Sequence, residues 1–308
     1  MAMWIMKGLC VVGIILNVFL MWKKTKEMRA NPEKDPVIGM TGEEMWQQQK
    51  KFAVVTAIIG LVANFLDTLG IGSFAPTSAA FKITKSVDDV LVPGTLNVGD
   101  TVPVCVEAFL FFGLVEMDVL TLVLMIAASV AGSILMAGVV SKFDRKMVRY
   151  TLFIGLFILA TVVLMKNLGV GPFGIQGTAT TLRGVKLVVA VVGNFIFGAL
   201  MSIGVGLYAP CMAMVLALGM NAGCAFPAMM GSCAYLMAFG NGPKFIQEGR
   251  FDMVASWMQA IFGAIGVFIA YLFVKSLPLD LLTKVIVVVV YITAFLYLKD
   301  AIQKGSNP

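Results

Sequence analysis

One seven-residue phrase occurs twice in this chain, and each copy interrupts a long apolar run. The segment 70–76 reads Gly-Ile-Gly-Ser-Phe-Ala-Pro, and the segment 204–210 reads Gly-Val-Gly-Leu-Tyr-Ala-Pro. Glycine frees the backbone, and proline cannot continue the hydrogen-bond ladder of a preceding helix. Broken helix at membrane depth is tolerated only where protein or a water-filled cavity satisfies the freed polar groups. The duplicated phrase therefore predicts two interrupted helices around a shared polar site.

The apolar runs themselves predict a polytopic membrane protein built from α-helices. Of the 308 residues, 59% are hydrophobic and 13% are charged, whereas soluble domains are about 45–50% apolar and about 25% charged. A helix crosses the hydrocarbon core of a bilayer with roughly 17–25 apolar residues. The clearest candidate runs are Val119–Val140, Thr151–Met165, Val185–Ile203, Met253–Val274 and Val285–Leu298. We expect residues 1–22 to form an additional, retained transmembrane helix, because basic residues follow directly.

The charge pattern indicates membrane topology rather than a nucleic-acid partner. The net charge is +6, and the basic residues gather between the apolar runs, mainly in the segments 23–51 and 142–149. Cytoplasmic loops carry such an excess of Lys and Arg, so we expect both segments on the cytoplasmic side. The chain has no His, and its five Cys residues lack the C-x-x-C spacing of metal or redox sites. We therefore expect no metal and no cofactor.

The two halves of the chain resemble each other beyond the duplicated phrase. Asn-x-Gly-x-x-x-Pro occurs at 97–103 and at 221–227, and an Asp and a Gly recur at matching places. We expect a repeat at 52–166, a linker at 167–184, a second repeat at 185–299 and a tail at 300–308, preceded by the helix 1–22 and the basic loop 23–51. An odd number of crossings per repeat inverts the halves, although parallel halves remain open. The predicted fold is two pseudo-symmetric repeats with discontinuous helices.

The breaks also predict the residues of a substrate site. If helices restart near Thr77 and near Cys211, their first-turn N–H groups and the positive end of the helix dipole favour an anion. Hydroxyl and amide side chains add hydrogen-bond donors. The candidate substrate-site residues are Gly70, Gly72, Ser73, Phe74, Pro76, Thr77, Ser78, Asn97, Thr101, Gly204, Gly206, Tyr208, Pro210, Cys211 and Asn221. Two alternatives stay open: the glycines serve only close helix packing, and the two Asn residues only cap helices.

Ionisable residues within the apolar runs occur only in the first half. They are Asp67, Lys82, Asp100 and Glu107. Charges at membrane depth are expensive and usually face protein or water. We expect Glu107, together with Asp67, to couple transport to protons, and Lys82 to attract the anion. The alternatives are a fixed ion pair for Glu107 and an interfacial position for Lys82.

With its paired breaks and duplicated halves, the chain resembles the TauE/SafE sulfite exporter family, also called the TSUP permeases, over about residues 52–298. The resemblance implies transport of sulfite, thiosulfate or an organosulfonate across the bacterial inner membrane.

We therefore expect a secondary transporter for a small anion that resides in the lipid bilayer and is not an enzyme. Neither H-E-x-x-H nor G-x-S-x-G occurs in the chain. A first alternative is a cation or metal carrier that uses Asp67, Asp100 and Glu107 as oxygen ligands. A second is a non-transporting receptor or assembly factor.

Overall fold

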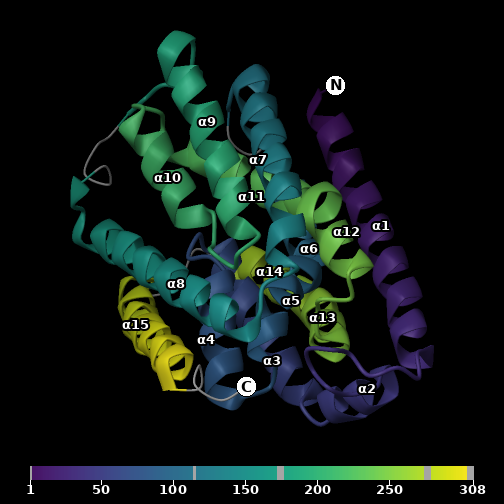
Figure 1. The fold of residues 1–308 in the computed structure, drawn as a ribbon. Coiled ribbons are helices and arrows are strands. Elements are labelled where there is room, and N and C mark those ends of the chain that lie inside the picture. Colours follow the sequence, from purple (N-terminus) through teal and green to yellow (C-terminus); the bar gives the residue numbers. More distant parts are fainter. Residues whose placement is uncertain (1, 114–115, 172–176, 274–278, 304–308) are drawn as a thin grey trace.

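The computed structural model describes residues 2–113, 116–171, 177–273 and 279–303, and these residues form helices and no strand. The first half contains α1 (Ala2–Ala30), α2 (Gly42–Lys50), α3 (Ala53–Thr68), α4 (Phe74–Thr84), η1 (Asp89–Leu91), α5 (Val92–Gly99), α6 (Thr101–Phe111), α7 (Val119–Val140) and α8 (Arg145–Leu168). The second contains α9 (Gly184–Met201), α10 (Tyr208–Ala217), η3 (Ala222–Cys224), α11 (Ala225–Tyr235), η4 (Leu236–Gly240), α12 (Asn241–Gln247), α13 (Met253–Met258), η5 (Gln259–Gly263), α14 (Ala264–Phe273) and α15 (Leu279–Gln303). Figure 1 shows their arrangement.

The fold is that of a multi-pass membrane protein, which confirms this part of the sequence prediction. Among the described residues, five helical stretches are long and apolar enough to cross a bilayer, and the bent pair α2–α3 makes a sixth if it counts as one span. Large apolar side chains on these helices face outward: Val185 is 79% exposed and Leu272 is 75% exposed. Surfaces of this kind are rare on soluble monomers, and lipid is their natural neighbour.

The N-terminal segment is more ordered than the expected helix 1–22 and loop 23–51. Helix α1 continues eight residues past the expected end, to Ala30, and lies along one edge of the molecule (Figure 1). Helix α2 begins with a capping box: the Thr41 hydroxyl accepts from the Glu44 N–H, and the Glu44 carboxylate accepts from the Thr41 N–H. Such reciprocal capping fixes a helix start within a polar segment. The basic segment thus contains a defined helix at one end of the molecule.

Both copies of the duplicated phrase lie between two helices and form matching backbone hydrogen bonds. Helix α3 ends at Thr68 and α4 begins at Phe74, while α9 ends at Met201 and α10 begins at Tyr208. The N–H groups of Gly70 and Ile71 donate to the carbonyls of Asp67 and Leu66, and those of Gly204 and Val205 donate to Met201 and Leu200. Gly70 has φ +78° and Gly204 has φ +96°, a conformation that favours glycine.

Helices α4 and α10 begin earlier than predicted from the sequence. The restarts lie at Phe74 and Tyr208 rather than near Thr77 and Cys211, so each proline is the third residue of its helix. A first-turn N–H has no partner within its helix, so proline loses nothing at this position.

Close helix contacts recur at matching positions of the two halves. A Cβ atom at Gly132 of α7 would overlap the carbonyl oxygen of Phe195 on α9, and one at Gly266 of α14 would overlap that of Leu61 on α3. Both pairs are related by 134 residues, since 266 minus 132 and 195 minus 61 give the same number. The helix before each break thus packs against a helix of the other half, α9 against α7 and α3 against α14.

Alanine at either contact glycine is therefore expected to destabilise the protein. We expect Gly132→Ala and Gly266→Ala each to lower the free energy of unfolding by about 1–3 kcal/mol, because backbone must move to admit the methyl group. The matched control is Gly8→Ala, since Gly8 lies in α1 with no heavy atom within 4 Å of the added Cβ. Thermal unfolding in detergent measures all three. Unchanged midpoints for both contact variants would contradict the packing.

The helix ends define two opposite ends of the molecule. Arg183, just before α9, forms an ion pair with Asp118, the N-cap of α7, with Nη1 and Oδ2 2.8 Å apart. Hydrogen bonds from Arg183 and Thr121 hold the pKa of Asp118 well below its ordinary value. Arg250, just before α13, instead donates to the Phe143 carbonyl beyond the other end of α7, at 3.0 Å. Helices α9 and α13 thus begin at opposite ends.

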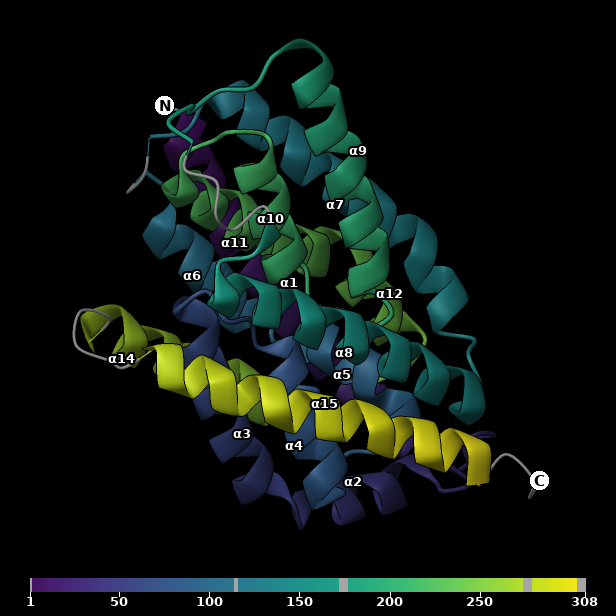
Figure 2. The same ribbon diagram turned by 90° about the vertical axis from the view of Figure 1, so that its left-hand side faces the viewer.

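The two basic segments lie at the same end, which we call the basic end. A cavity of about 300 Å³ there is lined by Gln48 and Gln49 of α2 and by Arg145 and Arg149 of α8. Helices α8 and α15 run side by side across the molecule, as Figure 2 shows.

Candidate functional site

The two breaks meet at a small cavity inside the bundle. Residues of the first break (Asp67, Ile71, Gly72, Ser73, Phe74 and Ala75) and of the second (Met201, Gly206, Leu207, Tyr208 and Ala209) line it, with Val104 and Cys233. A Cβ atom at Gly72 would lie 3.8 Å from the Tyr208 Cβ atom. The cavity volume of about 10 Å³ corresponds to about one water molecule. In this conformation the site is closed to any polyatomic anion.

The amide at the start of α4 is already bound by a carboxylate of the chain itself. The Ser73 N–H donates to Asp67 Oδ1 at 2.6 Å, and both side chains are buried. The N–H group at the observed start of α4 is therefore not free to bind a substrate anion. The positive end of the helix attracts negative charge, and Asp67 supplies it from within the break.

Glu107 connects the first half of the chain to the second. The Thr68 hydroxyl donates to Oε1 at 2.7 Å, and the Tyr208 hydroxyl lies 2.7 Å from Oε2. Glu107 is fully buried, and no Lys or Arg among the described residues forms an ion pair with it. The expected alternative of a fixed ion pair is therefore not met. A buried carboxylate without a cation partner needs hydrogen bonds or a proton.

Asn97 and Thr101 occupy structural positions rather than the cavity wall. The Asn97 amide donates to the carbonyls of Pro93 and Met201, and its oxygen accepts from Asn241 at 2.7 Å. The Thr101 hydroxyl donates to the Asn97 carbonyl. Asn97 therefore fastens α5 to the end of α9, just before the second break.

Asn221 does not belong to the site, and the repeated Asn motif was misleading. Asn221 is exposed, and its side chain accepts from the Gly223 N–H at the start of η3. Asp88 of the first half makes a similar contact, since its side chain accepts from the Val90 N–H at the start of η1. Asp88 and Asn221 are 133 positions apart (221 minus 88), whereas the two Asn residues of the motif are 124 apart (221 minus 97).

Thr77 and Ser78 are fully buried on α4, and their hydroxyl groups have no hydrogen-bond partner in the described part of the chain. Cys211, which follows Pro210 as Thr77 follows Pro76, is also fully buried. None of the three lines the small cavity, whereas Phe74 does. Pro76 and Pro210 are partly exposed within their first helical turns.

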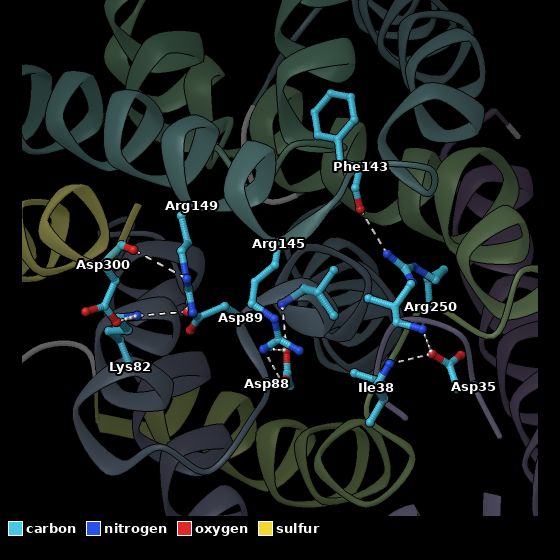
Figure 3. Close-up of polar contacts among 12 residues, drawn as sticks. Asp35, Ile38, Lys82, Asp88, Asp89, Phe143, Arg145, Arg149, Arg250 and Asp300 are labelled. Carbon is cyan, nitrogen blue, oxygen red and sulfur yellow. Dashed lines mark hydrogen bonds and ion pairs between the residues drawn. The ribbon is translucent and has the colours of Figure 1, made fainter. Parts of the chain in front are cut away.

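Lys82 lies at the basic end, in an ion-pair network, and does not reach the cavity. Its ammonium lies 2.9 Å from Asp89 Oδ2 and 2.8 Å from Asp300 Oδ2, and Arg149 shares both acidic residues (Figure 3). The prediction that Lys82 attracts the anion at the site is therefore wrong. Its charge is compensated twice, and the network ties α4 to η1, α8 and α15.

The next lysine, Lys85, has an unusual backbone conformation. It ends α4 with φ +54°, the one positive φ of a non-glycine residue in the described chain, whereas Gly219 has φ +80° at the end of α10. We expect Lys85→Gly to stabilise the protein by about 1 kcal/mol, because a Cβ atom is strained in this region. Lys85→Ala keeps the Cβ atom and is expected to give no gain. If both variants stabilise equally in thermal unfolding, lost charge rather than strain is the cause.

Several buried residues in or near the site were not predicted from the sequence. Asn64 and Thr68 lie one turn apart on α3, on the same side as Asp67, a spacing that could have revealed a polar face. Gln259, Met201 and Cys233 stand in apolar stretches of the second half and carry no local signal. No three His, Cys, Asp or Glu among the described residues could hold a metal ion together.

Comparison of this chain with protein-family models, curated proteins and solved structures finds no match. The fold and the site define a class, an all-helical, multi-pass membrane protein in which the two Gly-Pro segments between helices line one small cavity together with the buried carboxylate of Asp67.

Proposed function

We propose that this protein is a secondary transporter for a small sulfur-containing anion in the bacterial inner membrane. The observation that carries the proposal is the meeting of two helix breaks with the same hydrogen-bond pattern at one buried cavity. Interrupted helices at membrane depth are where secondary transporters place their substrate and ion sites. A receptor or assembly factor would need neither the breaks nor their meeting.

We infer that the chain consists of two inverted repeats with discontinuous helices. The equivalent pairs are α3–α4 with α9–α10, and α7 with α13–α14, each related by about 134 residues. Asp118 and Asp252 cap the start of α7 and α13 through the same i to i+3 hydrogen bond. These two starts lie at opposite ends of the molecule, as the contacts of Arg183 and Arg250 indicate. Opposite orientation of equivalent helices favours inverted over parallel halves.

The basic end is assigned to the cytoplasm on the positive-inside rule. Transport then proceeds by opening the closed cavity toward one end at a time, as in alternating access. The unpartnered hydroxyl groups of Thr77 and Ser78, next to the first break, are donors that an opened cavity offers to an anion. The sulfur chemistry of the substrate comes from the resemblance to the TauE/SafE family alone.

We propose Glu107 as the proton-carrying group, with Asp67 as its neighbour in the first break. A proton on Glu107 changes the hydrogen bond to Tyr208, which belongs to the other break. The carboxyl group therefore lies where a proton can alter how the two halves contact each other. Divalent metal transport through Asp67, Asp100 and Glu107 is disfavoured, because the three do not form a metal-binding group.

Ligand-induced stabilisation of the purified protein tests the substrate class. A true ligand raises the unfolding temperature according to its concentration and affinity. We expect sulfite, thiosulfate or a small sulfonate to do so, and acetate and divalent cations not to. A response to divalent cations without any response to the sulfur anions would overturn the proposal. Measuring flux of the stabilising anion into proteoliposomes then distinguishes a transporter from a non-transporting receptor.

A further inference from the structure

A second polar cluster lies beside the cavity, where α3, the α5–α6 junction and η5 meet. Asn64 on α3, Asp100 between α5 and α6, and Gln259 at the start of η5 are each fully buried. The Asn64 amide donates to Asp100 Oδ1 at 3.1 Å and to the Gly60 carbonyl. The Gln259 side-chain oxygen lies directly against Gly99, the residue before Asp100. The three side chains therefore form one contiguous group.

The cluster has more buried acceptors than donors. Asn64 Oδ1, Asp100 Oδ2 and Gln259 Oε1 have no hydrogen-bond partner among the described residues, and Gln259 Nε2 is the one donor left over in the group. Buried polar atoms in native proteins nearly always have a partner, so each exception calls for a bound water or ion. An excess of three unpartnered oxygens over one unpartnered amide nitrogen favours a positively charged ligand over another acceptor.

The unpaired charge of Asp100 also favours a bound cation. No Lys or Arg among the described residues pairs with Asp100, and the carboxylates Asp67 and Glu107 lie in the same buried region. An unpaired buried carboxylate is costly, and a bound cation removes that cost. One carboxylate with two amide oxygens carries a single negative charge, which suits a monovalent ion. Divalent ions in proteins usually take more carboxylates.

Local backbone geometry is consistent with a ligand site. Gln259 begins a five-residue π-helical turn, η5, within the α13–α14 span. Such turns are rare and are frequent at functional sites. Glycines at 60 and 99 keep space for Gln259, since a Cβ atom at 60 would come within 2.9 Å of its Cα atom and one at 99 would overlap its side-chain oxygen.

We propose that Asn64, Asp100 and Gln259 bind a sodium ion through their side-chain oxygens. The role of this sodium as the coupling ion of transport rests on the proposed function, whereas the binding of sodium does not. The site lies between the first-half helices and the second-half span α13–α14. A bound ion therefore joins the halves at a place distinct from the contact of Glu107 with Tyr208.

Thermal unfolding of the purified full-length protein without substrate tests the proposal. NaCl replaces choline chloride at constant ionic strength, and KCl is run in parallel. We expect the unfolding temperature to rise with Na⁺ and to saturate, with little change for K⁺. Asp100→Asn and Gln259→Met are each expected to weaken the apparent affinity for Na⁺ at least about tenfold, which is a loss of about 1.4 kcal/mol.

Asp252→Asn is the matched control, because Asp252 is a buried carboxylate that caps α13 through the Ala255 N–H, outside this cluster. It is expected to keep the Na⁺ response. An identical response to Na⁺, K⁺ and choline, or a full Na⁺ response in both cluster variants, would overturn the sodium site. If Asp100→Asn does not fold, Gln259→Met decides alone. A failed sulfur-anion screen with intact Na⁺ binding would overturn the proposed substrate and leave the sodium site standing.

Discussion

Replacing Glu107 by Gln is expected to abolish accumulation of the anion driven by a pH gradient. Glutamine keeps the volume and can hydrogen-bond to Thr68 and Tyr208, whose hydroxyl groups rotate to donate or accept. It cannot take up and release a proton in the physiological range. We expect pH-driven uptake into proteoliposomes to fall by about 10²-fold, a typical effect of losing a proton-transferring group.

Substrate binding and exchange separate this loss from misfolding. Glu107→Gln should still be stabilised by the anion and should still exchange labelled for unlabelled anion without a pH gradient. The matched control is Glu116→Gln, because Glu116 is exposed and is expected to leave uptake unchanged. Proton-driven uptake at the normal rate by Glu107→Gln would remove this residue from the mechanism.

A cross-link between the two breaks is expected to stop transport completely. Cβ atoms at positions 72 and 208 would be 3.8 Å apart, within the range of about 3.5–4.5 Å found in disulfides. We expect Gly72→Cys combined with Tyr208→Cys to oxidise to an intramolecular disulfide that holds the cavity closed. The five native Cys residues, all buried and unpaired, are first replaced. Peptide mass spectrometry identifies the bond.

Comparison of the same double variant before and after reduction isolates the effect of the bond. Gly72→Cys combined with Asn221→Cys serves as the control pair, since Asn221 is exposed and outside the cavity. That pair is expected to stay reduced. Because Gly72 has φ +93°, the double variant is first shown to fold. Absence of the 72–208 bond in the folded variant would then contradict the closed contact, and equal, measurable flux in the oxidised and reduced forms would contradict the need for the breaks to separate. Even if loss of Tyr208 impairs flux, bond formation still tests the geometry.

Much of the fold was predictable because membrane insertion imposes strong local rules. Lipid requires every backbone polar group to be satisfied within the segment, so apolar length alone predicts helices at places such as Val119–Val140. Glycine and proline determine the breaks by backbone chemistry at single positions. The restarts at Phe74 and Tyr208 were missed because proline is tolerated anywhere in the first helical turn, so it does not define where the helix begins.

The partners of the candidate residues were not predictable, because they depend on contacts between distant segments. Glu107 pairs with Tyr208, 101 positions away, and Lys82 pairs with Asp300, 218 positions away. The sequence correctly marked Glu107 as unusual but gave no means of finding its partner. The Asn motif was no guide to the site, because Asn97 is buried and bonded to the end of α9 whereas Asn221 is exposed.

The buried carboxylates Asp67, Asp100 and Glu107 of the first half have no acidic residue at the matching positions of the second half. At the positions of Asp67, Asp100 and Glu107, the second half carries Met201, Ala234 and Asn241 when numbers are shifted by 134. If the two halves are inverted repeats, chemically identical halves would give two symmetry-related conformations of equal energy. Since Asp67, Asp100 and Glu107 have no acidic counterparts at these positions, a cation bound beside them would stabilise one conformation over the other.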